Sequence, residues 1–279
     1  MVFITTQSLN AEIVRQQRMA QDIASEQVKI STGHRINRPS DDPQDWIQIS
    51  LVGKQQAMNA AWQSNLDFAV SRATKATSNL NDITNLMTRV TDLLVSGSST
   101  TQASPGREAI AVELENIRTT ISDLLDQTDY QGQPVFDDTS TVNVPVGAGL
   151  FVEAVPTRQS ISDNAVGDGR TLEQVLDDAI AAIRSGTDAD RDQALGDARV
   201  ALDHVIVAQS VQGVREQRLE DIGNRLTDSA LALTERRSTL EDTDLTETIA
   251  KLQNKLTTLE AAQAAFARIS QTSLFDFLR

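Results

Sequence analysis

Side chains able to hold a metal ion or move a proton gather in two acidic stretches. The first is R-P-S-D-D-P-Q-D-W, Arg38–Trp46, with three aspartates. The second is G-T-D-A-D-R-D-Q-A-L-G-D, whose alternating aspartates, Asp188–Asp192, have the spacing of a calcium-binding loop. That loop also needs a glycine at its sixth position and a glutamate at its twelfth, where Gln193 and Arg199 stand here. A calcium loop is therefore excluded, and we expect these aspartates to cap the start of a helix.

The remaining chemistry-bearing residues are too scattered to form a catalytic site. The two histidines, His34 and His204, lie far apart in the sequence, and there is no cysteine. Thiol catalysis, disulfides and thiolate metal sites are thus excluded. Adjacent carboxylates such as Asp41 and Asp42 do not face each other on one element, so adjacency alone makes no acid–base pair. With no nucleotide-binding or hydrolase motif either, we predict no enzyme activity, no metal and no cofactor.

Charge and composition narrow the class of protein further. The net charge is −14 and the pI is about 4.6, which makes nucleic acid and anionic membranes poor partners. No stretch is long and apolar enough for a membrane span, and M-V-F-I-T-T-Q-S-L-N is not a cleavable secretion signal. The chain is 39% hydrophobic but only 4% aromatic. Such a composition is typical of long helices with narrow apolar stripes.

Periodicity and capping residues predict a mainly helical chain. Asp42 is a suitable N-cap and Pro43 a suitable first residue for a helix that continues to about residue 95. The other helices are expected at 8–32, 107–128, 171–184, 188–241 and from 245 onward. The stretch T-V-N-V-P-V-G-A-G-L-F-V-E-A-V, residues 141–155, predicts a strand pair around a glycine-rich bend. Trp46 and Trp62 fit either packing between helices or contact with another subunit.

Both chain ends carry apolar residues at heptad spacing, which predicts that the terminal helices pair as a coiled coil. The N-terminal series also includes Gln16 and Gln27, so it is a polar seam. The sequence also carries an apolar, association-prone tail after the second arm. The predicted assembly residues are Leu9, Ile13, Ile23 and Ile30 in the first arm, Leu245, Ile249, Leu252, Leu256, Leu259 and Phe266 in the second, and Leu274, Phe275, Phe277 and Leu278 in the tail.

Three motifs carry a resemblance to a known family. The stretch S-T-G-H-R-I-N-R-P-S-D-D-P, residues 31–43, resembles the signature shared by bacterial flagellins and hook-associated protein 3. Q-G-Q-P-V-F-D-D resembles a turn of the same family, and E-D-T-D-L-T-E-T resembles the segment that leads into its C-terminal arm. The resemblance covers about residues 5–140 and 190–279. The proline-flanked R-P-S-D-D-P and the ending S-L-F-D-F-L-R are more similar to hook–filament junction members than to flagellins.

The resemblance implies an elongated, flagellin-like helical bundle. Residues 1–42 and 242–279 would form the terminal coiled coil (D0), residues 43–140 and 171–241 the helical rod (D1), and residues 141–170 a small β portion. In this family the arms are disordered in the free subunit and fold on assembly. The joint between arm and rod would consist of Arg38, Pro39, Ser40, Asp41, Asp42 and Pro43.

The implied function is structural: a secreted, extracellular subunit that joins the flagellar hook region to the filament. Export would use the flagellar type III apparatus without signal cleavage. The implied partners are hook-associated protein 1, flagellin, further copies of the chain in a ring, and an export chaperone on the C-terminal arm. Two alternatives remain open: flagellin itself, the bulk filament subunit, and a secreted helical binding module or translocator.

Overall fold

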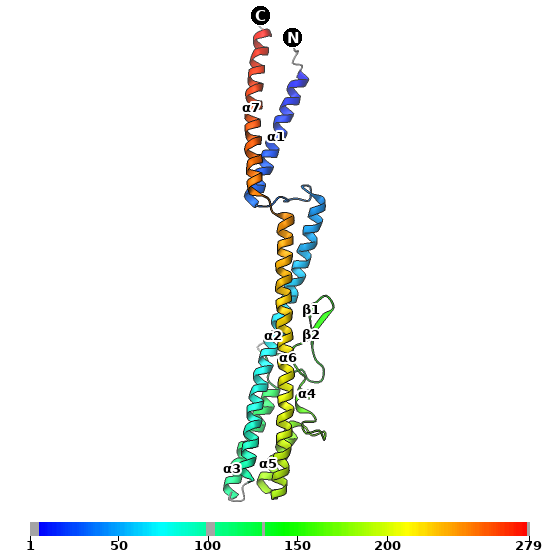
Figure 1. Ribbon diagram of the computed structural model, residues 1–279, viewed down its shortest axis with the longest axis vertical. Coiled ribbons are helices and arrows are strands. Elements are labelled where there is room, and N and C mark those ends of the chain that lie inside the picture. Colours follow the sequence, from blue (N-terminus) through cyan, green and yellow to red (C-terminus); the bar gives the residue numbers. More distant parts are fainter. Residues whose placement is uncertain (1–5, 99–103, 130–131, 278–279) are drawn as a thin grey trace. The chain divides into compact units, whose positions relative to one another are not determined.

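The computed structural model describes residues 6–98, 104–129 and 132–277, with side chains described for residues 10–98, 105–129 and 132–268. Helices dominate, as predicted, and a short two-stranded sheet accompanies them (Figure 1). The elements are α1 (Thr6–Thr32), α2 (Pro43–Gly97), α3 (Ser104–Leu125), β1 (Asn143–Gly147), β2 (Leu150–Glu153), α4 (Arg158–Ser162), α5 (Leu172–Ser185), α6 (Asp188–Glu241) and α7 (Leu245–Phe277).

The chain folds into two compact units, each made from separate stretches of sequence. The first contains residues 1–57 and 230–279, and the second contains residues 58–229. Both division points lie inside helices, one in α2 and one in α6. The first unit holds the terminal helices, and the second holds the hydrophobic core and the sheet.

Local capping residues account for several helix ends. Gly33, with φ 75°, ends α1, because a left-handed conformation costs glycine least. Thr171 and Gln174 cap the start of α5 by reciprocal side-chain-to-backbone hydrogen bonds. Asp244 accepts a hydrogen bond of 3.0 Å from the N–H of Glu247 and so caps the start of α7.

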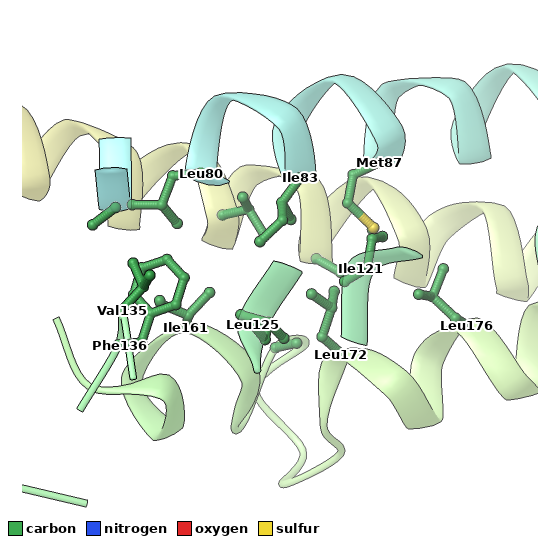
Figure 2. Close-up of a cluster of buried hydrophobic side chains, with 14 of the residues drawn as sticks. Leu80, Ile83, Met87, Ile121, Leu125, Val135, Phe136, Ile161, Leu172 and Leu176 are labelled. Atoms are coloured by element: carbon green, nitrogen blue, oxygen red, sulfur yellow. The ribbon is translucent and has the colours of Figure 1, made fainter. Parts of the chain in front are cut away.

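The core of the second unit lies where α2, α3, α5 and α6 pack together. Figure 2 shows Leu80, Ile83 and Met87 of α2 pointing toward residues of α3 and α5. All three are fully buried. Phe136 closes this core from the segment after α3 and is 1% exposed. Burial of this apolar surface is the main stabilising contribution to the unit.

Strands β1 and β2 form an antiparallel hairpin with an irregular register between Pro145 and Gly147. Val144, Val146 and Val152 are buried, whereas Phe151 is 54% exposed. The alternation expected of a half-buried strand is therefore present. Asn65 of α2 anchors the hairpin by donating a 2.8 Å hydrogen bond to the carbonyl of Pro145.

A buried ion pair fastens the segment before the hairpin to α2. Arg72 and Asp137 lie 2.9 Å apart, and each side chain is only 6% exposed. The same guanidinium donates to the carbonyl of Pro134 at 3.0 Å, and the second oxygen of Asp137 accepts from the N–H of Val142 at 2.7 Å. Because a buried charge needs several partners, this arrangement compensates the desolvation of both residues.

Helix α6 has two apolar faces. Val205, Leu219, Ile222 and Leu226 are buried on the inner face. The outer face carries the valine stripe, defined as Val200, Val207, Val211 and Val214, which are 49%, 61%, 45% and 71% exposed. Three of these valines recur every seven residues, the spacing of a helix-pairing surface.

Candidate functional site

Arg35 is the centre of the joint between α1 and α2. Its guanidinium pairs with Asp45 at 2.5 Å and with Asp42 at 3.4 Å. It also donates a 3.0 Å hydrogen bond to the carbonyl oxygen of Leu240, in the last turn of α6. The hydrogen bond to Asp45, supported by Asp42, raises the pKa of Arg35 above its usual value despite partial burial.

The first two aspartates of the acidic stretch bind backbone N–H groups. Asp42 caps α2, because its Oδ1 accepts hydrogen bonds of 3.1 Å from the N–H groups of Gln44 and Asp45. These contacts, with the N–H of Asp45 foremost, hold the pKa of Asp42 below its usual value. Asp41 accepts from the N–H of Asn37 at 3.0 Å and of Arg38 at 2.9 Å. Both carboxylates therefore shape the loop and the start of the helix.

Backbone pairing ties this loop to the segment between α6 and α7. The N–H of Arg35 donates to the carbonyl of Glu241 at 2.7 Å, and the N–H of Thr243 donates to the carbonyl of Gly33 at 2.9 Å. His34 and Asp242 form an antiparallel bridge. The two connections to the terminal helices are thus joined to each other at one place.

The predicted joint residues lie in this loop, but the strongest contacts come from a residue outside the predicted set. Arg38, Pro39, Ser40 and Asp41 are exposed. The side chain of Arg38 forms no ion pair within the described part of the chain. Arg35 and the buried Ile36, 2% exposed, were not assigned a role from sequence, although both stand in the quoted S-T-G-H-R-I-N motif. Periodicity gave no signal for either, since they follow the end of α1.

The terminal helices α1 and α7 lie side by side and run in opposite directions (Figure 1). Their less exposed positions repeat at alternating steps of three and four, as in a two-helix seam. We call these positions the arm seam: Glu12, Gln16, Met19, Ile23, Glu26 and Ile30 in α1, and Thr248, Leu252, Lys255, Leu259, Ala262 and Phe266 in α7.

The arm seam differs from the series expected from apolar periodicity. Ile23, Ile30, Leu252, Leu259 and Phe266 belong to it. The other expected residues face outward: Ile13, Leu245, Ile249 and Leu256 are 40%, 47%, 42% and 39% exposed. With Val14 and Val28 they form what we call the outer arm faces. The side chains of Leu9, Leu274, Phe275, Phe277 and Leu278 lie outside the described ones.

Glu26 is the buried charge of the arm seam, at 7% exposure. Lys255 donates to one of its carboxylate oxygens at 2.8 Å, and Lys29 lies 3.5 Å from the other. The hydrogen bond from Lys255 is the foremost cause that lowers the pKa of Glu26 from its ordinary value of 4.5, against the opposing effect of burial. The seam thus places a charge pair where a coiled coil would ordinarily carry apolar residues.

The second acidic stretch is used for helix capping. Asp190 accepts a 2.7 Å hydrogen bond from the N–H of Thr187, whose hydroxyl accepts from the N–H of Asp190 at 3.3 Å. Asp188 pairs with Arg191. Within the described residues, no group of three acidic, histidine or cysteine side chains could hold a metal ion. No described helix has the length and apolar character needed to cross a membrane.

Comparison with known families gives an assignment for both halves of the chain. Residues 4–141 match the bacterial flagellin N-terminal helical region, and residues 195–278 match the bacterial flagellin C-terminal helical region. Together these matches cover well over half of the chain, including the joint and both arms. The chain belongs to the bacterial flagellin family.

Within the flagellin family, curated relatives of two kinds are similar to this chain. Flagellar hook-associated protein 3 of Escherichia coli K12 is 26% identical, over 89% of this chain and 90% of its own length. Flagellin of Bacillus subtilis 168 is also 26% identical, over 87% of this chain and 88% of its own length.

A solved structure described as a flagellar hook-associated protein, from Vibrio parahaemolyticus, has the same flagellin-family fold. Its TM-score is 0.67 at 19% identity, over 72% of this chain and all of that one. At that identity the likeness concerns the fold alone.

Proposed function

We propose that this flagellin-family chain is a structural subunit of the bacterial flagellum that joins the hook region to the filament. The observation that carries the proposal is the similarity to flagellar hook-associated protein 3 of Escherichia coli along nearly the whole length of both chains. The proline-flanked R-P-S-D-D-P joint supports the same branch of the family.

The outer arm faces support a role in assembly. Apolar side chains at 39–48% exposure on both terminal helices leave water-exposed hydrophobic surface at heptad spacing. Five of the twelve arm-seam residues are polar or charged, so the arms bury less apolar surface by pairing with each other than an apolar coiled coil would. Helices of neighbouring subunits that cover the outer arm faces would bury this surface and stabilise the arms.

The valine stripe of α6 supports a second contact. The exposed positions of α2 in the same unit include small polar residues, such as Ser71, Thr74, Ser78 and Asn85, and its exposed apolar residues, Met58, Val70 and Val95, are widely spaced. The contrast between the two long helices shows that an apolar outer face is not a general feature of this unit. We assign the valine stripe to packing between neighbouring subunits.

The partners follow from this role. The subunit associates with other axial proteins of the extracellular flagellum, and we propose hook-associated protein 1 and flagellin as its neighbours. Heterologous packing of copies around the axis would give a closed ring. Before assembly, an export chaperone that binds an amphipathic helix would protect the outer face of α7 during type III export.

Flagellin is the second candidate, because the flagellin of Bacillus subtilis is as similar in sequence identity as the hook-associated relative. The two functions differ in copy number. Quantitative mass spectrometry of purified flagella, with the hook protein as internal standard, distinguishes them. We expect this chain at a small fixed ratio to the hook protein, unchanged when filaments are sheared short. An amount that scales with filament length would identify a bulk filament subunit.

A further inference from the structure

The placement of charge in the arm seam is unlike that of an ordinary helix pair. Glu26 lies between Ile23 and Ile30 in α1, and Lys255 lies between Leu252 and Leu259 in α7. Each charge is thus bracketed by apolar seam neighbours. The two charges meet at 2.8 Å across the pair, and Glu26 is 7% exposed.

This arrangement penalises every neighbouring register. If α7 slides by one seam position, Glu26 faces Leu252 or Leu259 instead of Lys255. The carboxylate then stays buried without its partner from the other helix, which is far less favourable than either the paired state or an apolar contact. The apolar seam residues alone do not discriminate between registers, because leucine and isoleucine repeat along both helices.

Register also decides how the outer arm faces are presented. Ile13 on α1 and Leu245, Ile249 and Leu256 on α7 lie on faces that neighbouring subunits must recognise together. A slip of one seam position moves the faces past each other by about 5 Å, since a helix rises 1.5 Å per residue. Such a shift takes apolar side chains out of line with any fixed partner surface.

At their base the terminal arms are already joined by the backbone hydrogen bonds from Arg35 to Glu241 and from Thr243 to Gly33. We propose that the Glu26–Lys255 pair sets the register of the terminal arms beyond that joint, and that its main effect is specificity of alignment rather than stability. A polar pair in a helix seam is known to fix register at a cost in stability. This inference rests on the proposed function for its consequence in assembly, but the register itself is a property of the single chain.

Disulfide trapping on the purified full chain tests the register directly, because the chain has no native cysteine. From the Glu26–Lys255 contact, Met19 lies two seam positions earlier in α1, and Ala262 lies two seam positions later in α7. Because the two helices are antiparallel, both residues lie on the same side of the contact. Met19→Cys is combined with Ala262→Cys for the native register, and with Leu259→Cys or Phe266→Cys for the slipped registers. The ratio of the three cross-links reports the register even where the arms pair only part of the time.

In the parent chain we expect the 19–262 cross-link to exceed either slipped cross-link at least about tenfold. In a Glu26→Leu, Lys255→Leu background the three yields should come within about threefold of one another, although the arms remain helical. The charge-swapped background, Glu26→Lys with Lys255→Glu, should restore the 19–262 preference. A 19–262 preference that survives in the leucine background, or that is absent from the parent, overturns the proposal.

Incorporation into flagella gives a second readout. The leucine background should incorporate poorly and the charge swap well, in proportion to their native-register cross-links. If the cross-links behave as expected but no variant enters flagella, the register assignment stands and the proposed function fails. If all variants enter flagella equally although their cross-links differ, register does not limit assembly, and that consequence of the proposal is wrong.

Discussion

The guanidinium of Arg35 donates a 3.0 Å hydrogen bond to the carbonyl oxygen of Leu240, a residue 205 positions further along the chain. This contact closes the joint: the loop that leaves α1 is held to the end of α6, while the same guanidinium holds the first turn of α2 through Asp42 and Asp45. A charged donor to a helix C-terminal carbonyl is also favoured by the helix dipole. One side chain therefore connects three helix ends.

Replacing Arg35 with alanine should loosen the joint without unfolding the core of the second unit. The side chain is partly exposed, so its loss should cost only about 1–2 kcal/mol locally. Amide hydrogen exchange at residues 243–248 should then become about 5- to 30-fold faster, while exchange at the buried α2 residues Leu80–Met87 stays unchanged. Arg35→Lys keeps the positive charge but loses the planar guanidinium with its several N–H donors. Its amide exchange at residues 243–248 should therefore lie between that of the parent chain and that of Arg35→Ala. Unchanged exchange at 243–248 would show that Arg35 does not hold the joint.

The buried Arg72–Asp137 pair should be among the most sensitive positions of the second unit. Arg72→Met leaves the Asp137 carboxylate buried with one partner fewer, which should cost about 3–5 kcal/mol. Urea unfolding followed by far-ultraviolet circular dichroism measures the loss. Arg89→Met is the matched control, because the Arg89–Glu113 pair is 55% and 43% exposed and should contribute less than about 1 kcal/mol. Equal losses in the two variants would contradict the argument from burial.

Acid should weaken the arm pair through Glu26. Because the pKa of Glu26 is lowered in the folded chain, its stabilising effect is complete above its ordinary value of 4.5 and disappears as the pH falls below that value. Amide exchange in α1, corrected for intrinsic rates, should therefore accelerate between pH 5 and pH 3. The control is Glu26→Gln, which should lack this part of the pH dependence. An identical pH profile in both proteins would mean that Glu26 is not the titrating group.

The valine stripe predicts an assembly defect without a folding defect. Val207→Asp combined with Val214→Asp should change the free energy of unfolding by no more than about 1 kcal/mol, because both side chains are at least 61% exposed. Incorporation into flagella should fall at least about tenfold, since two carboxylates would be buried at a subunit contact. Ser78→Asp with Asn85→Asp adds the same charge to the outer face of α2 and should incorporate normally. Normal incorporation of the α6 variant would show that the valine stripe is not part of the contact between subunits.

Local signals in the sequence predicted most of the fold. Asp42, Gly33 and Asp244 mark helix ends through hydrogen bonds within a few residues of themselves, and Pro43 does so through its fixed φ. Their effect can therefore be read from the sequence. The predicted helix at 188–241 matches α6, and the predicted strand pair is the β1–β2 hairpin. The boundaries of α3 lie three residues before the predicted ones, at Ser104 and Leu125. The single turn α4, capped by Thr157, was not predicted, because it has no periodicity of its own.

Long-range contacts account for what the sequence did not predict. The apolar heptads of the arms were expected to face each other, but several of them mark the outer arm faces. Periodicity finds apolar stripes and cannot tell whether a stripe faces the same chain or another one. Glu26 and Lys255 were missed for the same reason, since a charged residue in a seam breaks the pattern that would reveal it. Arg35 was missed because its partner Leu240 follows much later in the chain.

Electron microscopy of a strain that lacks this chain tests the central claim, that it joins the hook region to the filament, most directly. We expect hooks of normal length without filaments, flagellin released into the medium, and filaments restored by supplying the chain again. Filaments of normal number and length on the deletion strain would contradict it.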